Sequence, residues 1–345
     1  MKLRSGFVSI IGRPNAGKST LINALVGEKV AIVTAKPQTT RNRIHGILEV
    51  PAVKGRHPAA QIVFVDTPGV HKPGTSLDKR MMQEVYDALE TRDAVLLIVD
   101  ATRRLDLPEP DLPDPDAPAA LKQNRHVSED AFVFELLRKL DCPVFLLINK
   151  IDLIERSRLL PLIQKLASLY NFAEVIPISA RKRDGLEALM KKLIDVLPTG
   201  ERYFPKDQFT DQPERFLVAE LIRERILVET GEEVPYASAV VIERFEEPEP
   251  DAKKPVTHIA AVIYCERSGQ KAILIGKGGS KLKAIGTSAR KEIESLLGNK
   301  VFLELHVIVK DNWRESRGFV ESLDWRRQLE DMGPKDMGPK QDQEE

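Results

Sequence analysis

Gly12-Arg13-Pro14-Asn15-Ala16-Gly17-Lys18-Ser19 is the stretch of sequence that decides the fold of this chain. It has the spacing of a phosphate-binding loop, with an apolar run before it at 7–11 and a helical pattern after it at 19–25. Strand, glycine turn and helix thus follow the order that such a loop requires. Its glycines let backbone N–H groups face a polyphosphate, and the positive end of the helix adds attraction. The stretch therefore predicts a nucleoside triphosphate site.

A second motif, Asn149-Lys150-Ile151-Asp152, indicates which base is bound. The carboxylate of Asp152 can accept two hydrogen bonds from the donor edge of guanine, whereas adenine presents an acceptor there. The motif therefore predicts GTP rather than ATP. We expect Asn149 to brace the phosphate loop and Lys150 to cover the base, with Ser179-Ala180-Arg181 completing the pocket after the apolar segment 175–178.

A third motif, Asp66-Thr67-Pro68-Gly69, follows the strand pattern at 61–65. Asp66 is expected to hold Mg²⁺ through a water molecule, and the Gly69 N–H to reach the γ-phosphate. The hydroxyl of Ser19 would be a direct ligand of the ion. In the polar segment 36–41 one threonine is expected to close over the metal when a γ-phosphate is present, and we favour Thr40 over Thr39. Lys18, Thr40 and Gly69 are the predicted catalytic residues.

The segments GRPNAGKST, PQTTR, DTPGV, NKID and SAR have the order and spacing of the TrmE-Era family of P-loop translation GTPases, which the chain resembles over about residues 6 to 327. This resemblance implies hydrolysis of GTP by in-line attack of water. It also implies that the GTP contacts are made by Gly12, Arg13, Pro14, Asn15, Ala16, Gly17, Lys18, Ser19, Thr20, Asp66, Thr67, Pro68, Gly69, Val70, Asn149, Lys150, Asp152, Ser179, Ala180 and Arg181.

Two positions bear on the rate of hydrolysis. Val70 stands where Ras-like enzymes have a glutamine that orients water, and its side chain has no hydrogen-bonding group, so slow intrinsic turnover is expected. Asn15 matches the asparagine by which some relatives hold a potassium ion beside the phosphates. The alternative is that Asn15 only caps the loop.

Composition restricts the remaining function classes. Lys and Arg total 52, Asp and Glu total 52, and the formal net charge is zero, so any RNA binding has to come from a local arrangement of charge. No apolar run approaches 18 residues and the first strand begins within six residues of Met1, so neither a membrane span nor a secretory signal is expected. A cytoplasmic protein is the resulting expectation.

One segment has such a local charge arrangement. Residues 267–291 contain seven basic and no acidic residues, and a GxxG turn at 276–279 precedes an amphipathic helix. With a helix pattern near 217–222 and strands at 239–245, 259–265 and 301–309, this order is typical of a type II KH domain, which binds single-stranded RNA. An ordinary strand-to-helix turn on a solvated basic face is the alternative. The predicted RNA contacts are Gly276, Lys277, Gly278, Gly279, Lys281 and Lys283.

The sequence thus predicts a Ras-like P-loop GTPase domain of α/β class with a mainly parallel sheet, followed by an α+β type II KH domain. The expected boundaries are 1–198 for the GTPase domain, 199–206 for a linker, 207–328 for the KH domain and 329–345 for a disordered tail. An acidic, proline-rich insertion at about 103–122 is expected to be disordered, as an interaction site or a solvated spacer.

The resemblance also implies the partners. They are GTP and GDP, the 3′ end of 16S ribosomal RNA, the assembling small ribosomal subunit and a peripheral contact with the inner face of the membrane; DNA is not expected. Two alternatives to a GTP-hydrolysing assembly factor stay open: a GTP-binding scaffold with little or no turnover, and an RNA-modification GTPase of the same superfamily. Because the expected linker is short, we also expect the GTP state to alter RNA binding.

Overall fold

The computed structural model describes residues 2–34, 36, 39–70, 74–103, 128–231, 234–249, 251 and 253–332. Most of the expected insertion and the tail beyond Met332 lie outside these residues, as do Pro37 and Gln38 of the switch segment. The chain divides into two compact units, one of residues 1–73 with 81–212 and one of residues 74–80 with 213–345. Among the described residues, no helix has both the length and the apolarity to cross a lipid bilayer.

The first unit is built on a six-stranded sheet with the strand order β2-β3-β1-β4-β5-β6. Only β2 runs antiparallel to its neighbour, so the mainly parallel sheet is confirmed. The central strands are apolar runs buried on both faces, as parallel sheets require. The strands are β1 (Arg4–Ile11), β2 (Ile44–Val50), β3 (Ala60–Asp66), β4 (Ala94–Asp100), β5 (Val144–Asn149) and β6 (Glu174–Pro177).

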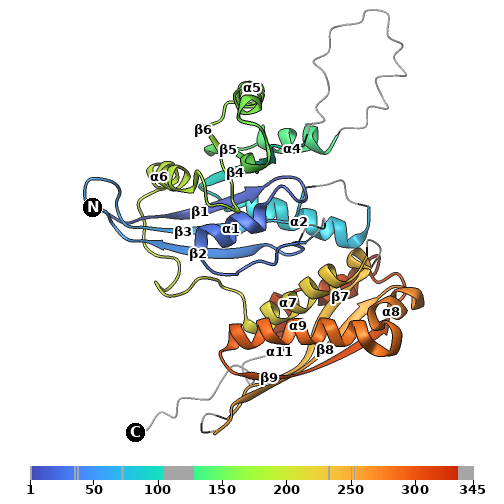
Figure 1. Cartoon of the computed structure of the whole chain (residues 1–345). Helices are drawn as coiled ribbons and strands as arrows, with labels where there is room; N and C mark the ends of the chain where they lie inside the picture. The colour runs from blue at the N-terminus through green and yellow to red at the C-terminus, as the bar shows by residue number, and fades with distance from the viewer. Residues whose placement is uncertain are drawn as a thin grey trace, which may run out of the picture. The chain divides into compact units, whose positions relative to one another are not determined.

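Helices cover both faces of this sheet (Figure 1). Helices α1 (Lys18–Val26) and α6 (Leu186–Val196) pack on one face, and α2 (Ser76–Glu90), α4 (Glu129–Leu137) and α5 (Arg156–Ala167) on the other. The phosphate loop follows β1, and the other two motifs begin at the last residues of β3 and β5. Because these three strands are parallel, their carboxyl ends bring the motifs to one edge of the sheet.

Residues 199–212 pack along the first unit rather than forming a free connection. The buried amide of Gln61 on β3 donates to the Phe204 carbonyl oxygen at 2.8 Å and accepts from the N–H groups of Tyr203 and Phe204 at 2.8 and 3.0 Å. The Ile47 N–H of β2 donates to the Phe209 carbonyl oxygen at 2.9 Å. In the structure the expected linker, 199–206, therefore groups with the first unit.

The second unit has a three-stranded sheet in which β8 (Val256–Cys265) is central, antiparallel to β7 (Ala239–Glu246) and parallel to β9 (Lys300–Val309). Helices α7 (Glu214–Glu229), α8 (Ser268–Ile275) and α9 (Ser280–Leu297) pack on one face of this sheet, where Ile222, Leu274 and Ile285 are fully buried. Figure 1 shows α7 and α9 side by side on that face. The arrangement is the predicted KH fold.

Helix α8 is absent from the order expected from the sequence, and the structure corrects that order. The helix is only eight residues long and buries a single residue, Leu274, so its sequence carries little periodicity. Its start is fixed by the Gln270 side chain, whose Oε1 accepts hydrogen bonds from the N–H groups of Glu266 and Arg267. Consequently the GxxG turn joins two helices and not a strand and a helix.

The remaining described elements are short. They are the 3₁₀ turns η1 (Ile151–Leu153), η2 (Pro235–Ala237) and η3 (Lys277–Gly279), and the helices α10 (Arg317–Ser322) and α11 (Trp325–Met332). Trp313, which precedes α10, is fully buried, and its indole N–H donates to the Ala237 carbonyl oxygen at 2.9 Å. This contact fixes the segment after β9 to the core of the second unit.

Candidate nucleotide and RNA sites

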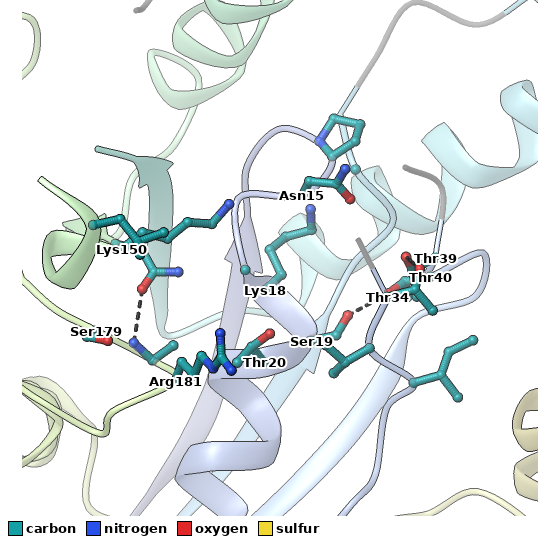
Figure 2. Close-up of a pocket in the computed structure, with 18 of the residues that line it drawn as sticks. Asn15, Lys18, Ser19, Thr20, Thr34, Thr39, Thr40, Lys150, Ser179 and Arg181 are labelled. Carbon is teal, nitrogen blue, oxygen red and sulfur yellow. Dashed lines mark hydrogen bonds between the residues drawn. The ribbon is translucent and has the colours of Figure 1, made fainter. Parts of the chain in front are cut away.

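A pocket of about 550 Å³ opens at the carboxyl edge of the first unit's sheet. Figure 2 shows Lys18, Ser19 and Thr40 on one side of it, and Lys150, Ser179 and Arg181 on the other. The lining residues that the sequence predicted are Pro14, Asn15, Gly17, Lys18, Ser19, Thr20, Thr40, Gly69, Asn149, Lys150, Asp152, Ser179, Ala180 and Arg181. Residues of five separate motifs thus meet around one cavity.

Glycine is required at the turn of the phosphate loop for space as well as for conformation. Gly17 has φ of 104°, in the left-handed region, and a Cβ on it would lie 2.3 Å from the Asn149 Nδ2. A Cβ on Gly12 would lie 2.4 Å from the Ile98 carbonyl oxygen. The loop is therefore pressed against β4 and β5, which leaves its other side to the pocket.

Lys18 is held inside the loop. Its side chain is buried, and Nζ donates to the carbonyl oxygens of Gly12 at 3.1 Å and Arg13 at 3.0 Å. Burial lowers the pKa of Lys18 to about 8, and the nearby Asp66 carboxylate only partly opposes that shift. A phosphate group arriving in the pocket would favour the charged form of this lysine.

Three oxygen-bearing side chains meet beside Lys18. The hydroxyl of Ser19 lies 2.7 Å from Asp66 Oδ2 and 2.9 Å from Thr40 Oγ1, and Thr40 donates to Asp66 Oδ2 at 3.2 Å. Burial raises the pKa of Asp66, against the opposing effect of Lys18, and its Oδ1 is buried with no hydrogen-bond partner among the described residues. Two hydroxyls and a carboxylate are the hard oxygen ligands that Mg²⁺ prefers, so these residues fit the ion.

Thr39 is placed differently from Thr40. Its hydroxyl donates to the Lys36 carbonyl oxygen at 2.8 Å and lies 3.1 Å from the hydroxyl of Thr34. The structure thus groups Thr40, and not Thr39, with Ser19 and Asp66.

Asn149 connects the phosphate loop with the base-binding segments. Its Nδ2 donates to the Ala16 carbonyl oxygen at 2.8 Å, and its Oδ1 accepts from the Ala180 N–H at 3.0 Å. The Asp152 Oδ1 accepts from the Ser179 hydroxyl at 2.8 Å, which aligns the carboxylate beside the same loop. The bracing expected of Asn149 is the geometry observed.

Several predicted residues do not line the main pocket. Arg13 faces α4, where it pairs with Glu129 at 2.9 Å and Asp130 at 3.0 Å. The Thr67 hydroxyl donates to the Ile10 carbonyl oxygen, and the buried Val70 donates its N–H to the Gly12 carbonyl oxygen. Arg13, Thr67 and Val70 therefore make their contacts on the side of the phosphate loop that faces away from the pocket. The predicted residues outside the lining are Gly12, Arg13, Ala16, Asp66, Thr67, Pro68 and Val70.

Other lining residues were missed by the sequence reasoning: Ile32, Val33, Thr34, Arg103 and Leu153. Leu153 directly follows the base motif, lines the pocket and is 65% exposed. Its position next to Asp152 was the available signal. The others lie in segments without a motif, so only the folded chain brings them to the pocket.

The GxxG turn of the second unit is open at its last two glycines, whereas a Cβ on Gly276 would lie 2.8 Å from the Lys281 Cβ. Gly278 and Gly279 have φ of 58° and 78°, and a Cβ on either would meet no described atom within 4 Å. Lys277 and Lys283 are exposed, whereas the ammonium of Lys281 donates to the Glu229 carbonyl oxygen at 2.7 Å, at the end of α7. Lys281 therefore anchors the turn, while Lys277 is accessible for a phosphate backbone.

Two family models match the chain. The model described as a 50S ribosome-binding GTPase matches residues 7–150, and the KH domain model matches residues 233–314. Similar proteins include the GTPase Era of Lacticaseibacillus paracasei, 45% identical with 92% of this chain and 96% of that protein covered. The GTPase Era of Geotalea uraniireducens is also 45% identical, with 93% and 98% covered.

Two solved structures agree along the whole fold, each with a TM-score of 0.79 and 37% identity. One is an Aquifex aeolicus Era variant bound to GDP and aluminium fluoride, covering 93% of this chain and 98% of that one. The other is Era with MgGDPNP and nucleotides 1506–1542 of 16S ribosomal RNA, covering 92% and 98%. With these relatives matched over nearly their full length, the chain belongs to the Era family of GTPases.

Proposed function

We propose that this GTPase is an assembly factor of the small ribosomal subunit, and that its KH domain binds the 3′ end of 16S ribosomal RNA. The observation that carries the proposal is the open GxxG turn with an exposed Lys277, on the same chain as a nucleotide pocket. An open glycine turn at a helix start permits a sugar-phosphate backbone to approach closely. The relative solved with 16S nucleotides supports the choice of RNA.

In the proposed reaction the protein positions GTP and neutralises charge. Lys18 and the loop N–H groups hold the β- and γ-phosphates, and the Gly69 N–H contacts the γ-phosphate. Ser19 and Thr40 would hold Mg²⁺ directly and Asp66 through water; when bound, the ion neutralises the charge that develops on the phosphates. Because Val70 is buried and apolar, no side chain at that position orients the water, so intrinsic hydrolysis is slow.

Nucleotide state is proposed to control RNA binding. The switch segment runs through Thr40 into β2, and residues 204–210 are hydrogen-bonded along β2 and β3 before the chain enters α7. A change in the switch segment would therefore act on the residues that lead into the KH domain. This supports coupling between GTP and RNA rather than two independent sites.

RNA binding is tested by fluorescence anisotropy with an oligonucleotide of the 16S 3′ end and a scrambled sequence of equal length. The account predicts tighter binding of the 16S sequence, and equal binding would contradict it. Co-sedimentation with isolated 30S and 50S subunits tests the assembly role. Preference for 50S subunits would overturn the small-subunit assignment.

Two finer expectations belong to the same proposal. Potassium is proposed to bind near Asn15, whose φ of 63° places it in the left-handed region beside the pocket. Equal GTPase rates in sodium and potassium salts would contradict a potassium site near Asn15. A cytoplasmic location with peripheral contact at the inner face of the membrane is proposed from the family resemblance, and co-sedimentation with anionic vesicles tests the contact.

A further inference from the structure

We propose that Asp100, at the carboxyl end of β4, is a positioning residue for guanine nucleotide binding because it fixes the side chain of Lys150. Asp100 belongs to none of the five motifs that predicted the site. The inference rests on the nucleotide role proposed for residues 149–152, and it adds a residue from another strand to that role.

The two oxygens of Asp100 have separate partners. Oδ2 accepts a hydrogen bond from Lys150 Nζ at 2.5 Å, and Oδ1 accepts from the N–H and the hydroxyl of Thr102 at 2.9 and 2.6 Å. Because Thr102 holds one oxygen with two donors, the carboxylate cannot rotate freely. The other oxygen is thereby aimed at the lysine.

The pair is not an ordinary surface ion pair. The Asp100 side chain is only 6% exposed and that of Lys150 30% exposed, so water screens the interaction incompletely. Burial by itself would raise the pKa of Asp100, but hydrogen bonds from Lys150 and Thr102 outweigh it and hold that pKa below its usual value. The carboxylate is therefore charged when nucleotide binds at neutral pH.

The backbone of Lys150 needs such a restraint. Its φ of 66° is in the left-handed region, which costs a non-glycine residue about 1 kcal/mol or more. The Ala101 N–H donates to the Asn149 carbonyl oxygen at 2.9 Å, so residues 100–101 hold both the backbone before Lys150 and its ammonium group. Figure 2 shows the Lys150 side chain extended along the pocket.

The consequence is a fixed place for the long lysine side chain before nucleotide arrives. An unrestrained lysine loses rotamer entropy on binding, whereas a held one has already lost it. Asp100 would thus increase affinity for GDP and GTP alike without entering the hydrolysis step.

The test is a double-mutant cycle on the full chain. Asp100→Asn removes the charge and keeps the size, Lys150→Ala removes its partner, and both changes are combined. Asp141→Asn is the matched control, because Asp141 forms an ion pair with Arg92 and lies before the amino end of β5, away from the pocket. Fluorescent GDP titration gives Kd, steady-state GTP hydrolysis gives kcat and KM, and melting of the nucleotide-free protein reports folding.

For Asp100→Asn we expect Kd for GDP and KM for GTP to rise about tenfold, the scale of one hydrogen bond to a charged group, with kcat unchanged. The double variant should bind no more than about twofold more weakly than Lys150→Ala alone, because the two residues act as one unit. Asp141→Asn should match the wild type. If Asp100→Asn lowers the melting temperature of the nucleotide-free protein, Thr102→Ala replaces it in the test. For Thr102→Ala we expect Kd for GDP to rise about threefold.

The inference would be overturned if Asp100→Asn and Thr102→Ala both bound GDP as tightly as the wild type. It would also be overturned if the increase in Kd of the double variant equalled the product of the two single increases, because the two residues would then act independently. A fall in kcat at unchanged KM would also overturn it, since it would place Asp100 in the chemical step. Failure of the wild type to bind guanine nucleotide is a distinct result, which would instead remove the proposed roles of residues 149–152.

Discussion

The phosphate loop before α1 and the GxxG turn before α9 are both glycine turns at the start of a helix. The two turns differ in their surroundings. A Cβ on Gly17 would lie 2.3 Å from Asn149, whereas a Cβ on Gly278 would meet no described atom within 4 Å. The lysine of the first turn, Lys18, is buried against backbone carbonyls, and the lysine of the second, Lys277, is exposed.

This difference matches the two kinds of ligand. A mononucleotide fits a pocket of about 550 Å³, in which the buried Lys18 and fixed N–H groups bind phosphate strongly because water screens a buried charge only weakly. A polynucleotide has to enter and leave sideways, so its turn has to stay open. A glycine turn at a helix start can therefore bind a mononucleotide or a polynucleotide, depending on whether other segments of the chain pack against the turn.

The comparison predicts its largest effect for Gly17→Ala. The added methyl group forces the loop away from Asn149 and requires a left-handed alanine, so GDP affinity should fall by more than about 100-fold. RNA affinity in the absence of nucleotide should be unchanged. Gly278→Ala, measured alongside, should leave GDP affinity intact; equal GDP binding by all three proteins would contradict the contrast.

The next effect concerns the two threonines of the switch segment. Thr40→Ala removes a hydroxyl grouped with Ser19 and Asp66, so kcat for GTP should fall about 30-fold in Mg²⁺. Thr39→Ala is the matched control and should change kcat by less than about threefold, because its hydroxyl contacts Thr34 and Lys36. The reverse ranking in single-turnover hydrolysis would assign the metal to Thr39.

A smaller effect is expected at the open turn. Lys277→Glu reverses one exposed charge, so affinity for the 16S 3′-end oligonucleotide should fall about tenfold and its salt dependence should weaken. GTP hydrolysis should not change. The control Lys191→Glu makes the same change of net charge on α6 of the first unit. If it weakens RNA binding as much as Lys277→Glu does, the loss comes from the net charge of the protein and not from a contact at the turn.

The smallest effect is a pH dependence of the buried lysine. Lys18 has a pKa of about 8 in the free protein and a higher one beside phosphates, so nucleotide binding takes up a proton as pH rises past 8. GDP affinity should therefore fall about fourfold between pH 7 and 8.5. RNA affinity over the same range is the comparison, and a flat GDP profile would show that Lys18 is not the titrating group.

The sequence predicted most of the nucleotide site because its residues occur in short motifs at strand ends. The mainly parallel sheet could be predicted because apolar strand runs alternate with helical patterns along the sequence. The KH domain could be predicted from the order of its helix and strand patterns around the GxxG turn. Helix α8 was missed because a helix that buries only Leu274 leaves no periodic pattern.

Contacts between distant segments could not be predicted. Asp100 and Lys150 are 50 residues apart and meet only because β4 and β5 are adjacent in the sheet. Arg13 likewise faces Asp130 on α4, and Gln61 holds residues 203–204, through packing that no motif records. Position in the sheet, rather than residue type, gave these side chains their roles.

The central claim is that nucleotide in the pocket of the first unit controls RNA binding at the open turn. The most direct measurement is the affinity for the 16S 3′-end oligonucleotide of protein saturated with MgGDPNP and of protein saturated with MgGDP. The account predicts binding at least about fivefold tighter with GDPNP, within the usual range of coupling between two sites. Equal affinities in the two states would contradict it.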